Sequence, residues 1–137
     1  MDNELSKLQG DGELVMRTIA MPSDTNANGD IFGGWLLSQM DLGGAIIAKS
    51  HSTSGRAVTV SIDSMSFINP VKVGDLVSCY AKLLSHGRTS MKVQIDAWTY
   101  SYTSHKLCHV TKGVFTYVAI DANGKPCPII EKPVVSL

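Results

Sequence analysis

The feature that most constrains the fold is an apolar segment at residues 34–49, which reads GWLLSQMDLGGAIIAK. It is long enough for about four turns of helix. Asp41 is its only ionisable side chain before Lys49. Apart from Ser38 and Gln39 the other residues are apolar or small, so nearly the whole circumference of this helix suits burial. A helix of this kind in a small domain must be wrapped by a curved sheet.

The segments around the helix have the composition of strands, being rich in β-branched and aromatic residues. The segment between the first strand and the helix is crowded with Pro, Asn, Asp and Gly, which predicts a loop at residues 21–30. His86-Gly87 lies between two of the later runs, where a tight hairpin would need a residue with positive φ. The expected strands are residues 14–20, 57–67, 75–85, 89–100 and 107–120.

This order of elements predicts an α+β fold in which one long central helix packs against a curved antiparallel β-sheet. A chain of 137 residues is enough for one domain with a proper core. We expect a flexible N-terminal tail at residues 1–12, a single domain at residues 13–122, and a C-terminal tail at residues 123–137, which begins at Asn123-Gly124.

Charge and cysteine content exclude several classes of partner. Twelve basic residues balance twelve acidic ones, so there is no electrostatic reason to expect nucleic acid or an anionic membrane surface as a partner. The acidic, polar start of the chain lacks the pattern of a secretion signal, and no apolar run approaches the ~20 residues of a membrane span. The three cysteines lack paired spacing, which favours reduced thiols and a cytoplasmic location.

Asp41 is the first candidate site residue. A carboxylate among apolar helix residues costs several kcal/mol to bury unless it is paired or shifted in pKa, and such groups often act as bases. The alternative is a structural Asp bonded to backbone N–H groups or to an Arg across an interface. Gly43 and Gly44 each cost roughly 1 kcal/mol relative to Ala in a helix interior, so we expect the backbone there to lie very close to another element or a ligand.

The loop that leads into the helix is the second candidate. Gly33 and Gly34 at the helix start would expose backbone N–H groups that can hold a developing oxyanion. Asn26 or Asn28 could orient a water molecule or a carbonyl group. The alternative is that these Asn and Gly residues only form turns.

The remaining candidates are weaker. His105 and His109 are four residues apart, and in a strand that separation is about 13 Å, too far for one metal ion, so we expect no metal site and plain surface histidines. Cys79 and Cys108 fit a core position better than a nucleophile. Arg88, beside a Gly turn and hydroxyl residues, could bind phosphate or could be a solvated turn residue.

Longer segments are specific to one family. Residues 26–41, NANGDIFGGWLLSQMD, resemble the active-site segment of the YciA-type acyl-CoA thioesterases of the hotdog-fold superfamily. The flanking segments RTIAMPSDT, VTVSIDSMSFINPVKVGD and GRTSMKV also resemble that family in order and spacing. The resemblance runs from about residue 17 to about residue 121, most of the chain.

The resemblance implies a hotdog fold, hydrolysis of acyl-CoA to a free acid and CoA, and a homohexamer built as a trimer of dimers. It implies an active site at the dimer interface, in which Asp41 of one subunit acts with the partner subunit's Asn26. The N–H groups at Gly33-Gly34 would polarise the thioester carbonyl, while Asp41 would activate water as a general base or attack the carbonyl itself. No cofactor is implied beyond the CoA moiety of the substrate.

Arg88 and Ser90 match the GR(S/T)S turn of the same family and are expected to bind CoA. Two other functions stay open from the sequence. One is a hotdog dehydratase or isomerase, which would use a His paired with an acid near the helix, although no His precedes Ser50. The other is an acyl-CoA-binding or sensing module without turnover.

Overall fold

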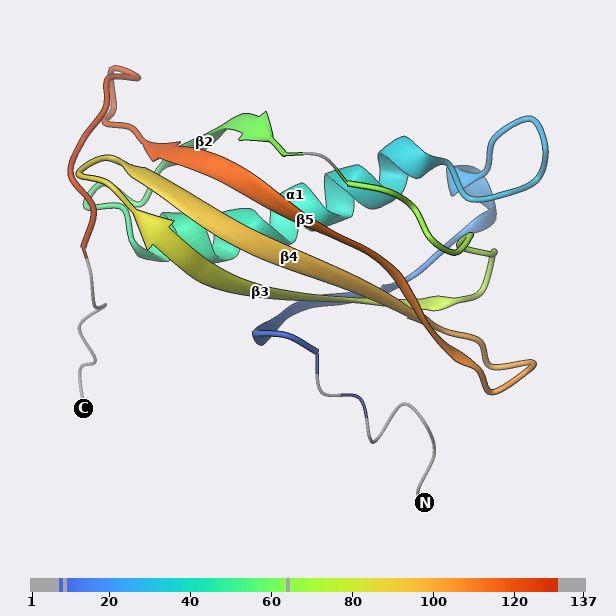
Figure 1. The fold of residues 1–137 in the computed structure, drawn as a ribbon. Coiled ribbons are helices and arrows are strands. Elements are labelled where there is room, and N and C mark those ends of the chain that lie inside the picture. Colours follow the sequence, from blue (N-terminus) through green and yellow to red (C-terminus); the bar gives the residue numbers. More distant parts are fainter. Residues whose placement is uncertain (1–7, 9, 64, 131–137) are drawn as a thin grey trace, which may run out of the picture.

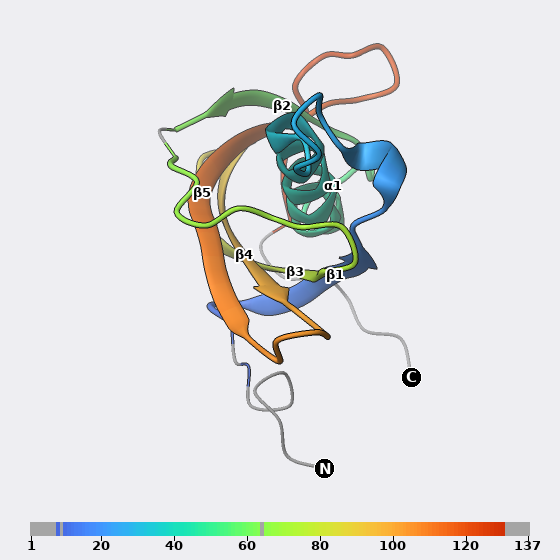
Figure 2. The same ribbon diagram turned by 90° about the vertical axis from the view of Figure 1, so that its right-hand side faces the viewer.

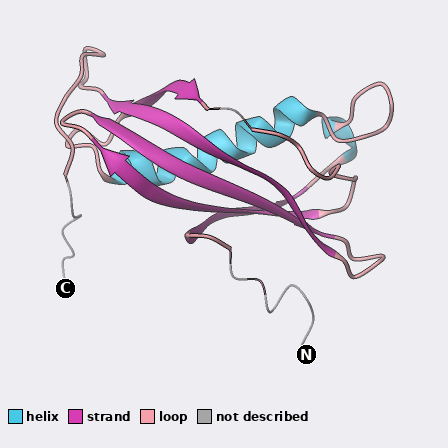
Figure 3. Cartoon of the chain, viewed as in Figure 1, coloured by secondary structure: helices cyan, strands magenta, loops and turns pink. Residues whose placement is uncertain are grey.

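The computed structural model describes residues 8, 10–63 and 65–130. They form one long helix and one sheet, drawn in Figure 1 and by element type in Figure 3. The sheet has five strands in the order β1-β3-β4-β5-β2, and all neighbouring strands are antiparallel. The elements in chain order are β1 (Glu13–Ile19), the 3-10 helix η2 (Pro22–Asp24), α1 (Gly33–Ser50), β2 (Ala57–Ile62), β3 (Leu76–His86), β4 (Ser90–Tyr100) and β5 (Leu107–Ala119).

The sheet curls around α1, and every strand contacts the helix (Figure 2). The core lies between them, because the inward side chains of β3, β4 and β5 meet the buried residues of α1, which include Leu36, Met40 and Ile47. The α+β prediction with a central helix is therefore confirmed. Within the described ranges, no helix combines the length and the hydropathy that a membrane span requires.

Gly43 and Gly44 lie where the helix comes close to the sheet. A Cβ atom added at Gly44 would overlap the Tyr117 hydroxyl and lie 2.5 Å from Ile95 Cδ1. A Cβ at Gly43 would lie 2.9 Å from Val15 Cγ2. The close approach expected from these two glycines is confirmed.

The expectation that α1 is buried on nearly its whole circumference is wrong for a single chain. Leu42 is 57% exposed and Ile46 is 52% exposed. The sheet leaves one side of the helix uncovered between its edges, β1 and β2 (Figure 2). Strand β2 is also exposed along most of its length, with Val60 at 54%. Because the five-stranded sheet is open, a single chain leaves one stripe of the helix and the exposed edge strand β2 uncovered.

The strand expected at residues 57–67 ends at Ile62. The chain continues beside β5 after this point, because Asp63 N–H donates to Val114 O at 2.9 Å and Ile68 N–H donates to Val110 O at 2.8 Å. Between these two backbone bonds a side chain takes part instead, because the Thr111 hydroxyl donates to Ser66 O at 2.8 Å. Local composition does not show where side-chain bonds replace backbone bonds, which is why the predicted strand was too long.

The expectation of positive φ at His86-Gly87 is also wrong. Among the described residues, positive φ occurs at Gly74, at 89°, and at a few other positions that do not include His86 or Gly87. Strand β3 ends at His86 and β4 begins at Ser90, so residues 87–89 connect the two strands. A type I turn can make such a connection without positive φ at its central residues.

Parts of both expected tails are bonded to the domain. Cys127 N–H donates to Ala119 O at 2.9 Å, and Ile129 N–H donates to Arg88 O at 3.1 Å. At the other end, Asp11 contacts Lys82 and Gln94 in the sheet. The remainder of both segments, at residues 1–7, 9 and 131–137, lies outside the described residues.

Candidate active site

Asp41 lies in the middle of α1 and is half-buried. Its Oδ1 atom accepts a hydrogen bond from the Thr59 hydroxyl at 2.6 Å. The Tyr117 hydroxyl lies 3.0 Å from the same oxygen and 2.9 Å from the backbone oxygen of Asp41. Across residues 8, 10–63 and 65–130 no ion pair involves this carboxylate. The site is therefore a carboxylate held by neutral donors rather than by an Arg or a Lys.

Tyr117 and Thr59 were not found from the sequence. They face each other across the β2–β5 pair, in register. Burial raises the pKa of the Tyr117 phenol, and the charge of Asp41 raises it further, so the phenol stays protonated and serves as a donor. The alternation along β5 could have indicated that Tyr117 points inward beside Phe115, because residues two apart in a strand share one face.

The loop before α1 is organised by Asn26. Its side-chain oxygen accepts hydrogen bonds from the N–H groups of Asn28, at 2.9 Å, and Asp30, at 3.2 Å. The Asn26 N–H donates to Asp30 O at 2.7 Å. Asn26 therefore holds the shape of this exposed loop in a single chain, which is the turn-forming role given above as the alternative. Its side-chain amide nitrogen is not used in these bonds, so it is available for a further contact.

The start of α1 exposes backbone donors. The helix begins after Phe32, which provides no side-chain cap. In the described part of the chain the N–H groups of Gly33 and Gly34 have no hydrogen-bond partner. A pocket of about 340 Å³ opens beside them. It is lined by Ser23, Asp24, Thr25, Phe32, Gly34 and Trp35.

A single chain does not bring these candidates to one point. Asp41 follows Gly34 by seven residues, which at 1.5 Å per residue separates them by about 10 Å along the helix. The Asn26 loop lies beyond the start of α1, farther from Asp41 than Gly34 is along that axis (Figure 1). Along the helix axis, one chain therefore holds these groups too far apart to act on one carbonyl.

Arg88 and Ser90 lie in the β3–β4 turn, at the end of the molecule opposite the Asn26 loop (Figure 1). Arg88 is exposed and Ser90 is half-buried. The Gly87 N–H donates to Ser90 O at 2.9 Å, which closes the turn. The structure thus does not bring this pair to the helix start of the same chain.

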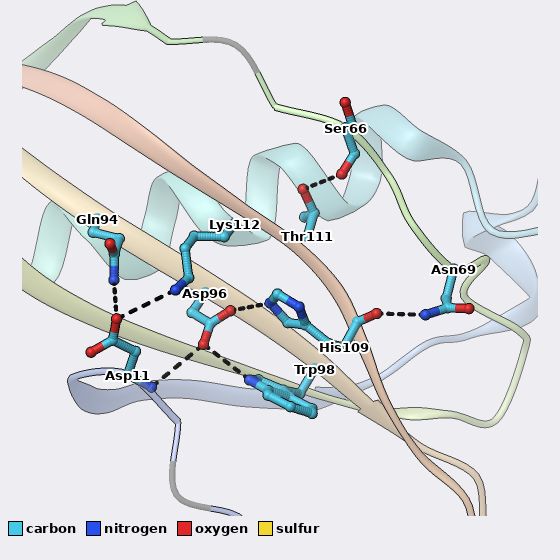
Figure 4. Close-up of polar contacts among 9 residues, drawn as sticks. All are labelled: Asp11, Ser66, Asn69, Gln94, Asp96, Trp98, His109, Thr111 and Lys112. Carbon is cyan, nitrogen blue, oxygen red and sulfur yellow. Dashed lines mark hydrogen bonds and ion pairs between the residues drawn. The ribbon is translucent and has the colours of Figure 1, made fainter.

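A second polar cluster lies on the sheet face that points away from α1 (Figure 4). Ile95 packs against the helix at Gly44, so its neighbour Asp96 points to the opposite face. The buried Asp96 carboxylate contacts His109 Nε2 and accepts a hydrogen bond from Trp98 Nε1 at 3.1 Å. The expectation that His109 is a plain surface histidine is wrong, because the register shift between Ala97 and Trp98 brings it beside Asp96.

This acid–histidine pair faces away from the helix and so does not supply the arrangement that a hotdog dehydratase or isomerase would need. Across the described ranges no group of three His, Cys, Asp or Glu residues could hold a metal ion. Cys79 is buried, as expected, and burial raises the pKa of its thiol to about 12, which disfavours a nucleophilic role. Cys108 is only half-buried.

Comparison with known proteins agrees with this fold. The family model described as the thioesterase superfamily matches residues 28–102. The acyl-CoA thioester hydrolase YciA of Salmonella typhimurium is 53% identical over 121 residues, covering 86% of this chain and 90% of the relative. The crystal structure of a hexameric thioesterase from Yersinia pestis is 52% identical, with a TM-score of 0.83, and covers 89% of this chain and 98% of that one.

A hexameric hotdog fold thioesterase of Campylobacter jejuni is 44% identical, with a TM-score of 0.82 over 88% of this chain and 92% of that one. The fold is therefore the hotdog fold, and the chain belongs to the thioesterase superfamily. Within that superfamily it is a member of the YciA acyl-CoA thioester hydrolase family.

Proposed function

We propose that this member of the family hydrolyses acyl-CoA to a carboxylic acid and free CoA with Asp41 as its catalytic carboxylate. The observation that carries the assignment is the setting of Asp41, which is half-buried in an apolar helix and free of any cationic partner in the described ranges. A carboxylate neutralised by an Arg or a Lys would be a weaker base, whereas hydroxyl donors orient it and leave its charge in place.

The chemistry requires few groups, because a thioester is already an activated acyl group. As a general base, Asp41 would take a proton from water while the water oxygen attacks the thioester carbonyl and the CoA thiolate leaves. As a nucleophile, it would form an anhydride that water then hydrolyses. In both routes the N–H groups of Gly33 and Gly34 would polarise the carbonyl oxygen. Neither route needs a metal or a cofactor other than the CoA of the substrate.

The site is proposed to be completed by a second copy of the chain. The separation of about 10 Å between Asp41 and the helix start in one chain favours an arrangement in which Asp41 acts with the partner subunit's Asn26. The exposed apolar side chains of α1 and the open edge of β2 are surfaces that a second chain would cover. We propose a dimer of this kind that assembles further into a hexamer, as the Yersinia pestis and Campylobacter jejuni relatives do.

CoA is proposed to lie along the subunit interface with its phosphates near Arg88 and Ser90. The guanidinium group of an exposed Arg fits a phosphate geometrically, and a neighbouring hydroxyl adds a donor. The three free cysteines fit a reducing compartment, which supports the proposed cytoplasmic location.

A thiol-trapping assay on a panel of acyl-CoA substrates tests the assignment. We expect turnover by the wild-type protein and a loss of roughly 10²-fold or more in Asp41→Ala, with the fold retained. Wild-type turnover in Asp41→Ala would rule out Asp41 as the catalytic group.

The same panel separates the other two functions. A binding or sensing module would bind the CoA esters and release no thiol. A dehydratase would change the absorbance of a crotonyl-type thioester without releasing thiol.

A further inference from the structure

We propose that Tyr117 and Thr59 are positioning residues that together hold Oδ1 of Asp41, so that Oδ2 is the oxygen that reacts with water or the thioester. This inference rests on the proposed catalytic role of Asp41 and specifies how the fold directs its carboxylate.

The two oxygens of Asp41 differ in their contacts. Oδ1 accepts the Thr59 hydroxyl at 2.6 Å and lies 3.0 Å from the Tyr117 hydroxyl. Within the described residues, Oδ2 has no hydrogen-bond partner. Because Oδ1 is occupied by donors that carry no charge, the oxygen available to accept a proton from water is Oδ2.

Both donors come from one cross-strand pair. Thr59 in β2 and Tyr117 in β5 are direct partners in the antiparallel register, so their hydroxyls reach the helix side by side. Tyr117 is fully buried and lies beside Phe115, with ring centroids 6.4 Å apart, which fixes its position. The Tyr117 hydroxyl also lies 2.9 Å from the backbone oxygen of Asp41, which ties the helix to the same point.

The backbone is adapted to this contact on both sides. A side chain at position 44 would occupy the space of the Tyr117 hydroxyl, so Gly44 admits the phenol to Asp41. In β2, the register shifts between Thr59 and Ser61. Such irregularities change the direction of side chains near functional sites, and here the register shift comes directly after Thr59, the residue that donates to Asp41.

The arrangement has a chemical consequence. Two hydroxyl donors at Oδ1 restrict rotation of the carboxylate and leave Oδ2 free to accept a proton. A misplacement of about 1 Å in such a group can cost about 10²-fold in rate. Removal of either hydroxyl should therefore lower kcat with little change in KM.

The test uses the intact protein and acyl-CoA hydrolysis measured by thiol release. We expect Tyr117→Phe and Thr59→Val each to lower kcat by about tenfold, with little change in KM. Thr59→Ser keeps the hydroxyl and should restore kcat. Tyr102→Phe is the matched control, since Tyr102 is 52% exposed and has no contact with Asp41.

Each outcome has one meaning. Wild-type kcat in both variants would overturn the inference, as would a raised KM with unchanged kcat, which a role in substrate binding alone predicts. Failure of Thr59→Ser to recover activity would also overturn it. Full activity in Asp41→Asn would instead reject the proposed function itself, and this variant is therefore measured in the same series.

Discussion

Asp11 lies over the sheet face that points away from α1, beside Gln94 and Lys112 (Figure 4). Its carboxylate accepts hydrogen bonds from Lys82 Nζ at 2.7 Å and from Gln94 Nε2 at 2.7 Å, with Lys112 Nζ at 3.4 Å. The bond from Lys82 is the main reason that the pKa of Asp11 falls from 3.8 to about 2. At the scale of single residues, this exposed carboxylate anchors the N-terminal segment through charge.

The lowered pKa of Asp11 predicts a pH dependence. A carboxyl group whose pKa is lowered on folding stabilises the folded form above its unfolded value, here 3.8, and loses this contribution as the pH falls through about 2. We expect Asp11→Asn to have a lower urea midpoint than the wild type at pH 5, and the difference to be much smaller near pH 2. The effect should be small, because the pair with Lys82 is exposed.

Glu13→Gln is the control for the Asp11 experiment, since it removes an exposed carboxylate from the adjoining strand. Urea denaturation followed at both pH values measures the difference. A midpoint difference between Asp11→Asn and the wild type that does not change with pH would contradict the assignment of the effect to this carboxylate.

At the scale of elements, the contact between α1 and the sheet depends on two adjacent glycines with different neighbours. A Cβ at Gly44 would meet the phenol of Tyr117 and the side chain of Ile95, both fully buried. A Cβ at Gly43 would meet one methyl group of Val15, which is half-buried and can move. Replacing each glycine by Ala should change helix propensity equally, so a difference in stability between the two variants measures the effect of packing.

Gly44→Ala should destabilise the protein although Ala is the better helix former. Overpacking costs typically 1–3 kcal/mol, against a propensity gain of roughly 1 kcal/mol, so we expect a net loss of up to about 2 kcal/mol. Gly43→Ala should be near neutral. Thermal unfolding at one fixed protein concentration measures both. Equal Tm values for the two variants would contradict the packing difference.

At the scale of the whole molecule, one chain leaves its helix stripe and its β2 edge open and holds its candidate catalytic groups apart. The proposed two-chain site makes a direct prediction. Asp41→Ala and Asn26→Ala chains, each inactive alone, should regain activity when they are co-expressed, because a mixed dimer holds one site with both residues intact. If the chains pair at random, about a quarter of the wild-type activity is expected.

The control for this experiment is a mixture of the two separately purified variants, assayed before subunits exchange, which should stay inactive. Co-expressed chains that form mixed oligomers by mass and yet show no recovered thiol release would mean that Asp41 and Asn26 act within one chain. A monomer in solution would equally contradict the two-chain site.

The periodicity of the apolar residues by itself determined α1, the order of elements and Asp41 as an isolated charge, because helix and strand patterns are local properties of the chain. Two expectations failed because they depended on distant partners: residues 63–67 left the regular ladder, and the Ala97–Trp98 register shift placed His109 beside Asp96.

Only the tertiary structure decided what Asp41 contacts. Thr59 lies 18 positions from it and Tyr117 lies 76 positions away. Such pairs meet because β2 and β5 align in one register and Gly44 lets the helix approach them. That alignment depends on long-range strand pairing, which the composition of either segment alone does not specify.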